Sequence, residues 1–169
     1  MNLPSTTTED FTLNYIIITR DDKIEKKCTL HPHRSRPDFD FRTRMNHGEF
    51  STNSILLFPD GETLTKELAK EIIDQFINNS KIQNLLNIVL IDTRWKKTKW
   101  ILESLPQLRR VSLVGFVTGA LRKDPPPPGG LASVEALYLT SFIFGKPDHS
   151  LLENYHFRNR FLKLNALDL

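Results

Sequence analysis

The chain has 169 residues, of which 39% are hydrophobic and 25% are charged, and its formal net charge is +3. This composition is typical of a globular protein, the length suits one domain with a sizeable core, and no apolar run reaches the roughly 20 residues of a membrane span. The start, MNLPSTTTEDF, lacks the basic and apolar parts of a secretory signal, and the single Cys28 excludes an internal disulfide and a multi-cysteine metal site. We therefore expect one cytoplasmic domain over 1–169, flexible over 1–13, with no membrane partner and with a monomer favoured.

The first half of the chain predicts strands separated by a long loop. NYIIITR (14–20) is β-branched and indicates a buried strand, with KKCTLHP (26–32) as a short partner. Residues 33–53 are polar, basic and aromatic without clean periodicity, which is typical of a functional loop or of a segment disordered when free. SILLF (54–58) indicates a second buried strand, closed by the turn signal PDG. One face of a following helix, reaching about Asn78, is marked by Leu64, Leu68, Ile72 and Phe76.

The second half continues the alternation of strands and helices. LLNIVLID (85–92) and RRVSLVGF (109–116) indicate strands, and the helix between them ends at Pro106. The buried face of that helix is predicted to carry Trp95, Thr98, Leu102 and Leu105. RKDPPPPGG (122–130) is neither helix nor strand, because prolines remove donors and fix φ. Residues 131–145 predict an almost wholly apolar, buried helix, and a last helix is expected over about 150–164.

Apolar strands that alternate with helices indicate an α/β fold with a mostly parallel sheet flanked by helices on both faces. Ligands of such sheets bind beyond the carboxyl ends of the strands. That rule selects FPDG (58–61), Asp92 and the segment from Gly115 as candidate sites. There is no G-x-G-x-x-G, P-loop or Ser- or Cys-centred triad pattern.

Basic residues gather in two places. Eight Lys or Arg stand between Arg20 and Arg44, and a second group follows Asp92. Basic patches attract phosphate-rich partners, and solvated surface charge is the alternative interpretation. The candidate RNA contacts are Arg34, Arg36, Arg42, Arg44, Arg94 and Lys97, with Lys96 and Lys99 beside them and Phe39, Phe41 or Phe50 for stacking on bases.

Three short pieces, IDTRW with P-x-L at 106–108, LRKDP and LASVEA, together resemble the DTW-domain family of uridine aminocarboxypropyltransferases, which are related to the SPOUT methyltransferases. That family carries Asp-x-Thr-Trp at a strand end, then R-x-x-P, then L-S-T-x-E-A at a helix start. Asp92, Trp95 and Glu135 match the pattern, and Ser133 replaces the family Thr of the last motif. Arg94 stands where the family has Thr and Ala132 where it has Ser, and the zinc-binding cysteines of many bacterial members are absent.

The resemblance implies a SPOUT-like fold with a C-terminal trefoil knot. It also implies transfer of the 3-amino-3-carboxypropyl group of S-adenosylmethionine to uridine N3 in RNA, with tRNA expected. Asp92 would accept the N3 proton and Trp95 would pack beneath it or supply its indole N–H. No metal ligand is expected. Contacts to the donor are expected from Phe58, Pro59, Gly61, Val114, Gly115, Arg122, Leu131, Ser133 and Glu135.

Each of these residues has a simpler interpretation. Asp92 suits the cap of the next helix, and Trp95 suits the core. Arg122 suits a solvated surface, while Ser133 and Glu135 suit the first turn of a helix without any ligand. Two other functions stay open as well: a non-catalytic RNA-binding paralogue, favoured by Arg94 in the motif, and a SPOUT-type RNA methyltransferase.

Overall fold

The structure is a computed structural model that describes residues 11–19, 29–43, 46–79, 84–93, 95–121 and 130–167, with the backbone alone at 77–79, 95 and 96. Within these residues the strands are β1 (Thr12–Thr19), β2 (Phe39–Thr43), β3 (Ser54–Thr63), β4 (Leu85–Asp92) and β5 (Arg109–Ser112). The α-helices are α1 (Lys66–Asn79), α2 (Trp95–Ser104), α3 (Ser133–Ile143) and α4 (Arg158–Leu164). Two short 3-10 turns, η1 (His31–His33) and η2 (His149–Leu152), complete the order.

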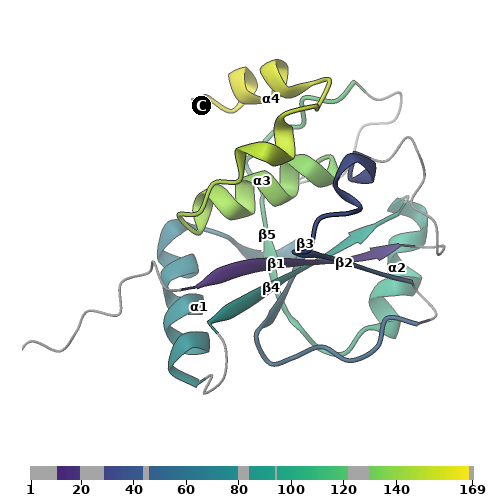
Figure 1. The fold of residues 1–169 in the computed structure, drawn as a ribbon, viewed down its shortest axis with the longest axis vertical. Coiled ribbons are helices and arrows are strands. Elements are labelled where there is room, and N and C mark those ends of the chain that lie inside the picture. The colour runs from purple at the N-terminus through teal and green to yellow at the C-terminus, as the bar shows by residue number, and fades with distance from the viewer. Residues whose placement is uncertain are drawn as a thin grey trace, which may run out of the picture.

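The five strands form one parallel sheet in the order β2-β1-β4-β3-β5. The predicted α/β class with a mostly parallel sheet is therefore confirmed (Figure 1). β4 lies at the centre, where Asp92 at its end is in register with Thr19 at the end of β1. The carboxyl ends of these two strands are thus level with each other, at the edge where parallel sheets bind ligands.

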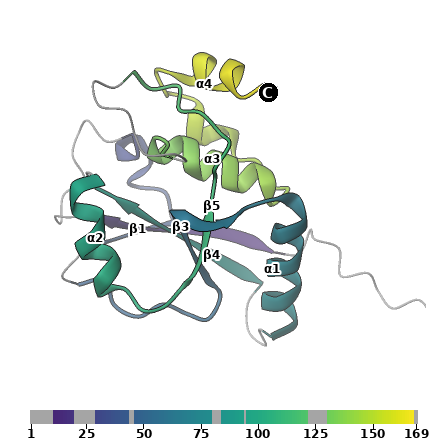
Figure 2. The ribbon, with the colours of Figure 1, turned by 180° about the vertical axis from the view of Figure 1, so that it is seen from behind.

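Both faces of the sheet are covered, which explains why its strands are apolar at successive positions. Ile17 and Ile88 face a large core shared with α1, α3 and α4. Ile18 and Val89 face a smaller core that Ile101 of α2 closes. Figures 1 and 2 show α3 and α4 stacked on one side of the sheet, with α3 between the sheet and α4.

α3 is confirmed as the buried apolar helix, although it is shorter than the predicted 131–145. Nine of its eleven residues are buried, because the sheet covers one side and the C-terminal segment covers the other. The Tyr138 ring meets the Phe161 ring of α4 edge-on at 6.4 Å. Such a helix shows no polar stripe, since no side of it faces water.

Several predicted strand boundaries are wrong. Residues 29–32, expected in a strand, form a turn and the first part of η1, while the part of 26–32 before Thr29 lies outside the described residues. β5 ends at Ser112 rather than at 116, because Gly115 takes a left-handed φ of 104° and turns the chain away from the sheet. Phe11 is 3% exposed and β1 begins at Thr12, so residues 11–13 of the expected flexible start belong to the fold, and residues 1–10 lie outside the described residues.

The predicted long loop over 33–53 contains a strand. β2 pairs with β1 in parallel, with Phe39 in register with Tyr15. The alternation of Phe39 and Phe41 with Asp40 and Arg42 is the period-two signal of a half-buried strand. It is only five residues long, so the polar residues around it obscured it.

The predicted last helix over 150–164 is two separate elements, η2 and α4. Leu151 and Leu152 are buried from η2, and Phe161 and Leu162 are buried from α4. In one continuous helix, residues ten positions apart would point about 80° away from each other. The break lets both apolar pairs face the core. No helix in the described ranges combines the length and apolarity that a membrane crossing requires.

Candidate active site

Asp92 and the start of α3 meet at the carboxyl edge of the sheet. The Ser133 hydroxyl donates a 2.7 Å hydrogen bond to Asp92 Oδ1, across 41 positions of sequence. Asp92 ends β4 and is half-buried, and Ser133 is the first residue of α3. The partial positive charge of a helix N-terminus favours a carboxylate in such a place. Two of the pieces that carry the family resemblance therefore come together in space.

Glu135 joins the start of α3 to the segment that follows β5. Its side chain is fully buried, and Oε1 accepts hydrogen bonds from the Thr118 hydroxyl at 2.6 Å and the Ala132 N–H at 2.8 Å. Oε2 accepts the Gly119 N–H at 2.7 Å. Charge-assisted bonds of this kind are about twice as strong as neutral ones. Glu135 therefore supports the chain around the site, and its described partners are protein groups.

The segment 113–121 is held from its other side by α4 and the residue that follows it. Asn165 accepts the Val117 N–H at 2.8 Å and donates to the Val117 carbonyl at 2.7 Å, as a neighbouring strand would. Arg160 donates to the Gly119 carbonyl at 3.1 Å. A Cβ at Gly119 would lie 2.7 Å from the Phe161 backbone nitrogen, so only glycine fits this approach. Figure 2 shows the chain leaving β5 past α3 toward α4.

The side chains on this fixed segment leave apolar surface open to solvent. Val114, Val117 and Leu121 are 44%, 51% and 69% exposed. Around Gly115 an added Cβ would meet no atom within 4 Å. Of the predicted donor contacts, Val114 and Gly115 thus lie on the exposed side, whereas Leu131 is buried in the core. Apolar surface on a rigid backbone suits the adenine ring of a nucleotide-like donor.

The predicted FPDG turn is a bulge inside β3. Leu57 and Glu62 both lie opposite Val111, so four residues, Phe58 to Gly61, project from the pairing. A Cβ at Gly61 would stand 2.6 Å from the Val111 nitrogen. Arg110 fastens the bulge through a 2.8 Å ion pair with Asp60 and by lying over the Phe58 ring. Phe58 and Gly61 are therefore engaged with β5 and its neighbours, and Pro59 is half-buried beside them.

Two of the predicted RNA-binding arginines form internal ion pairs. Arg36 contacts Asp38 at 2.7 Å and Asp148 at 2.6 Å. Arg42 pairs with Asp40 at 2.9 Å and also donates to the carbonyls of His47 and Glu49. These bonds organise the loops around β2.

The other predicted RNA contacts differ in exposure. Arg34 is exposed and donates to the His31 carbonyl at 2.8 Å, and Lys97 is half-buried on α2. Arg44, Arg94, Arg122 and the Trp95 side chain lie outside the described residues.

A titratable cluster that the sequence did not indicate joins η1 and the start of β2 to the C-terminal part. His33 stacks on Phe39, and its Nε2–H donates to the Leu151 carbonyl at 3.2 Å. Burial lowers the pKa of His33, and the positive charge of Arg36 lowers it further. Burial by itself raises the pKa of Asp148, but hydrogen bonds from Arg36 and Ser150 bring it below its usual value. No motif marks these residues, because their partners are distant in sequence.

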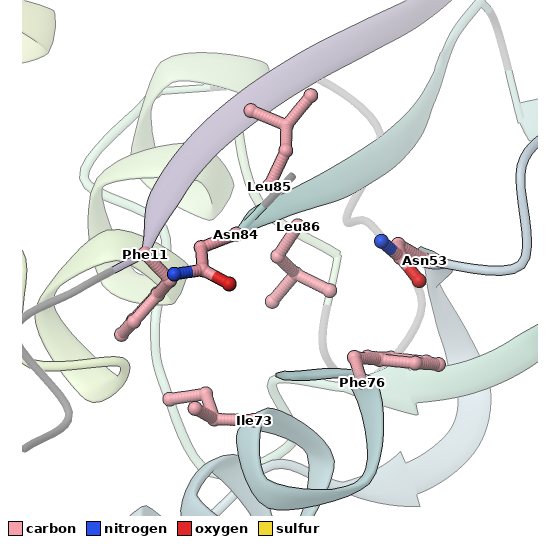
Figure 3. Close-up of a pocket in the computed structure, with 7 residues that line it drawn as sticks. All are labelled: Phe11, Asn53, Ile73, Phe76, Asn84, Leu85 and Leu86. Atoms are coloured by element: carbon pink, nitrogen blue, oxygen red, sulfur yellow. The ribbon is translucent and has the colours of Figure 1, made fainter. Parts of the chain in front are cut away.

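A small cavity lies at the opposite end of the strands (Figure 3). Its volume of about 10 Å³ has room for about one water molecule. Its lining is Phe11, Asn53, Ile73, Phe76, Asn84, Leu85 and Leu86. Because Phe11 precedes β1 and Leu85 begins β4, this cavity is at the amino edge and too small for a nucleotide. Among the described residues, no three His, Cys, Asp or Glu are placed to hold a metal ion.

Comparison with known proteins gives a likeness of fold. No family model matches the sequence, and no curated protein matches it significantly. Among solved structures, the chain is similar to the SAM-dependent rRNA:acp-transferase Tsr3 from Vulcanisaeta distributa, with a TM-score of 0.59 and 18% sequence identity. The match covers 92% of this chain and 80% of that chain. At this identity the likeness establishes a related α/β fold.

Proposed function

We propose that this chain transfers the 3-amino-3-carboxypropyl group of S-adenosylmethionine to a nucleobase in RNA, with uridine N3 as the acceptor atom. The hydrogen bond from Ser133 to Asp92 carries the proposal. It places the strand-end aspartate of one motif against the helix start of another, at the edge of the sheet where ligands bind. The solved structure with a related fold is an enzyme whose name states this type of transfer to rRNA.

The segment that Glu135 ties to the start of α3 suits such a donor. Segment 113–121 offers exposed Val114 and Val117, and Glu135 and Asn165 hold its backbone in place. A C-terminal trefoil knot belongs to the same proposal. It is supported by the contacts of Thr118 and Gly119 with Glu135 of α3 on one side and Phe161 of α4 on the other.

The chemistry requires a base and a fixed orientation. Uridine N3 is not nucleophilic until its proton leaves, and the Asp92 carboxylate would accept that proton while Ser133 fixes the direction of one carboxylate oxygen. The donor supplies an electrophilic γ-carbon next to a positive sulfur. The N3–C bond forms as the C–S bond breaks, and methylthioadenosine leaves. Orientation of the donor, rather than a different base, separates this transfer from methylation.

Two other functions are compatible with this fold, a non-catalytic RNA-binding protein and an RNA methyltransferase. Arg94 replaces the family Thr next to Trp95, which favours a non-catalytic RNA-binding paralogue. A methyl transfer to RNA would use the same fold with the donor turned. The sequence resemblance favours tRNA as the acceptor, whereas the structural neighbour is named for rRNA, so both RNAs belong in the test.

The decisive experiment uses two forms of the donor, labelled on the carboxyl carbon or on the methyl group. With the proposed transfer, RNA gains the carboxyl label and methylthioadenosine keeps the methyl label. RNA methylation gives the reverse pattern. If neither label reaches tRNA or rRNA, and the protein binds RNA without binding the donor, the chain is an RNA-binding paralogue and the proposal fails.

A further inference from the structure

Trp100 projects from the outer side of α2. The indole is 64% exposed, although tryptophan is a side chain that folded proteins bury extensively on average. Thr98 and Ile101 are buried at 5% and 1% exposure, and they fix α2 to the sheet on either side of this position. A large aromatic ring thus stands on rigid backbone and faces solvent. Such a ring suits the anchoring of a partner, because it offers a large contact area and loses little side-chain entropy when it is ordered.

The three phenylalanines considered for RNA stacking are less exposed than Trp100 and lie against other side chains of the protein. Phe39 is 8% exposed and packs between His33 and Tyr15. Phe41 stacks on Phe39 at 5.7 Å. Phe50 lies beneath the Arg42 guanidinium at 5.1 Å. Among the Phe, Tyr and Trp side chains of the described residues, Trp100 is the exposed one.

The charge around Trp100 identifies the partner. Four cations, Arg94, Lys96, Lys97 and Lys99, stand within the six positions before it. Lys99 is exposed, and Lys97 lies one helical turn from Trp100 on the same face. An aromatic ring among lysines suits single-stranded nucleic acid, where bases stack on the ring and phosphates meet the cations. A protein partner would favour an apolar surround instead.

The place of α2 connects this surface to the candidate active site. α2 begins three positions after Asp92, and Trp100 is five residues further, about 7.5 Å along the helix axis. α2 packs on the face of the sheet opposite α3 and α4 (Figure 1). RNA on the α2 side would therefore leave the α3 side to the donor.

We propose that Trp100 is a stacking platform for an unpaired base near the modified one, with Lys97 and Lys99 binding the adjacent phosphates. This inference rests on the proposed function, because that function supplies RNA as the partner. It assigns the outer face of α2 as the entry surface for single-stranded RNA.

The test measures the affinity of the full-length protein for an unstructured oligouridine and for an RNA duplex at several salt concentrations. Trp100→Ala should weaken oligouridine binding by about 5- to 150-fold, the range for loss of one base–aromatic stack. Its salt dependence should stay parallel to that of the wild type, because no charge is removed. Trp100→Phe should retain most of the affinity. Replacing Lys97 and Lys99 together by Ala should instead reduce the salt slope by about 1 to 2.

Leu164→Ala is the matched control, since Leu164 is 48% exposed on α4 and lies away from α2. It should leave RNA affinity unchanged. Unchanged oligouridine binding by folded Trp100→Ala overturns the platform, and it would leave α2 as a surface for a protein partner. The two proposals fail separately. If the wild type transfers the label to RNA and Trp100→Ala binds oligouridine as tightly as the wild type, only the platform is wrong. If Trp100→Ala binds oligouridine more weakly and the wild type transfers no label, only the proposed chemistry is wrong.

Discussion

Ser133 orients Asp92: the hydroxyl at the first residue of α3 donates to the carboxylate at the last residue of β4, at 2.7 Å. The contact links two segments that the sequence keeps 41 positions apart. It also separates two roles of Asp92, since accepting this bond needs only an oxygen, while accepting a proton from substrate needs a carboxylate.

Asp92→Asn should therefore retain the fold and lose the reaction. The amide oxygen can still accept the Ser133 bond, and Asn caps helices about as well as Asp. Loss of a general base typically lowers the rate by about 10²- to 10⁴-fold. Label transfer to RNA and the melting temperature are measured together. Ser133→Ala serves for comparison and should slow transfer less, and a fully active Asp92→Asn would confine Asp92 to a structural role.

Glu135→Gln should loosen the segment 113–121. A Gln side chain keeps one acceptor oxygen, and its NH₂ group would face either Gly119 N–H or the pair formed by Thr118 and Ala132. Unsatisfied buried donors cost about 1–3 kcal/mol, which denaturant unfolding measures. The increase in melting temperature on addition of S-adenosylmethionine should also be smaller than for the wild type. Glu67→Gln, an exposed acid in the first turn of α1, is the control and should change neither quantity.

Gly119→Ala tests the approach of this segment to α4. The new methyl group would meet the Phe161 backbone at 2.7 Å, so the chain has to move. Overpacking of this kind costs about 1–3 kcal/mol of unfolding free energy. Val117→Ala, at an exposed position of the same segment, should stay within about 0.5 kcal/mol of the wild type. Equal stability of the two variants would contradict the observed packing.

Stability should fall in mild acid because of His33. Burial and Arg36 lower the pKa of His33 in the folded state, so the unfolded chain binds the proton more readily. Its contribution to the unfolding free energy is complete above the ordinary histidine pKa of about 6.5 and declines as pH falls toward the folded-state value. The lowered pKa of Asp148 adds a second loss below about pH 4. Unfolding curves of His33→Gln should lose the first decline and keep the second.

Replacing Arg36 should lower the stability of the fold, whereas replacing Arg34 should weaken RNA binding. Arg36→Ala leaves Asp38 and Asp148 without their shared cation, which should cost about 1–3 kcal/mol for a partly exposed pair. Arg34 is exposed and bonds only locally in the described contacts, to His31. Arg34→Ala should keep stability within about 0.5 kcal/mol and reduce the salt slope of RNA binding by about 1. If Arg36→Ala reduced the salt slope of RNA binding and left the unfolding free energy unchanged, Arg36 would be an RNA contact rather than a structural residue.

The strands and helices with strong periodicity were predictable from sequence. Long apolar segments are recognised whatever residues flank them. They include the runs over 54–58 and 85–92 and the almost wholly apolar α3. β2 was missed because its alternation spans five residues among charges. β5 was predicted too long because the apolar run continues to Phe116, while the chain turns at 113–116 with a positive φ at Gly115.

The candidate site was predictable only as a set of motifs. Sequence indicated Asp92, Ser133 and Glu135 but assigned Glu135 to the donor, whereas its described partners are protein N–H and O–H groups. Arg36 and Arg42 were expected at RNA because basic runs are usually exposed, and no pattern announces a partner such as Asp148, 112 positions away. The contacts of Asn165 and Phe161 with segment 113–121 were equally hidden, since long-range pairing leaves no local period.

The dependence of segment 113–121 on α4 has a consequence for how the protein is made. During synthesis all five strands emerge before α3, which supplies Ser133 to Asp92 and covers one face of the sheet. Arg160, Phe161 and Asn165 come last, and only then are Val117 and Gly119 held on both sides. Because a chain emerges at about 5–20 residues per second, we expect several seconds to pass between the synthesis of β5 and the completion of the candidate site. Segment 113–121 can therefore reach its final position only after α4 has been synthesised.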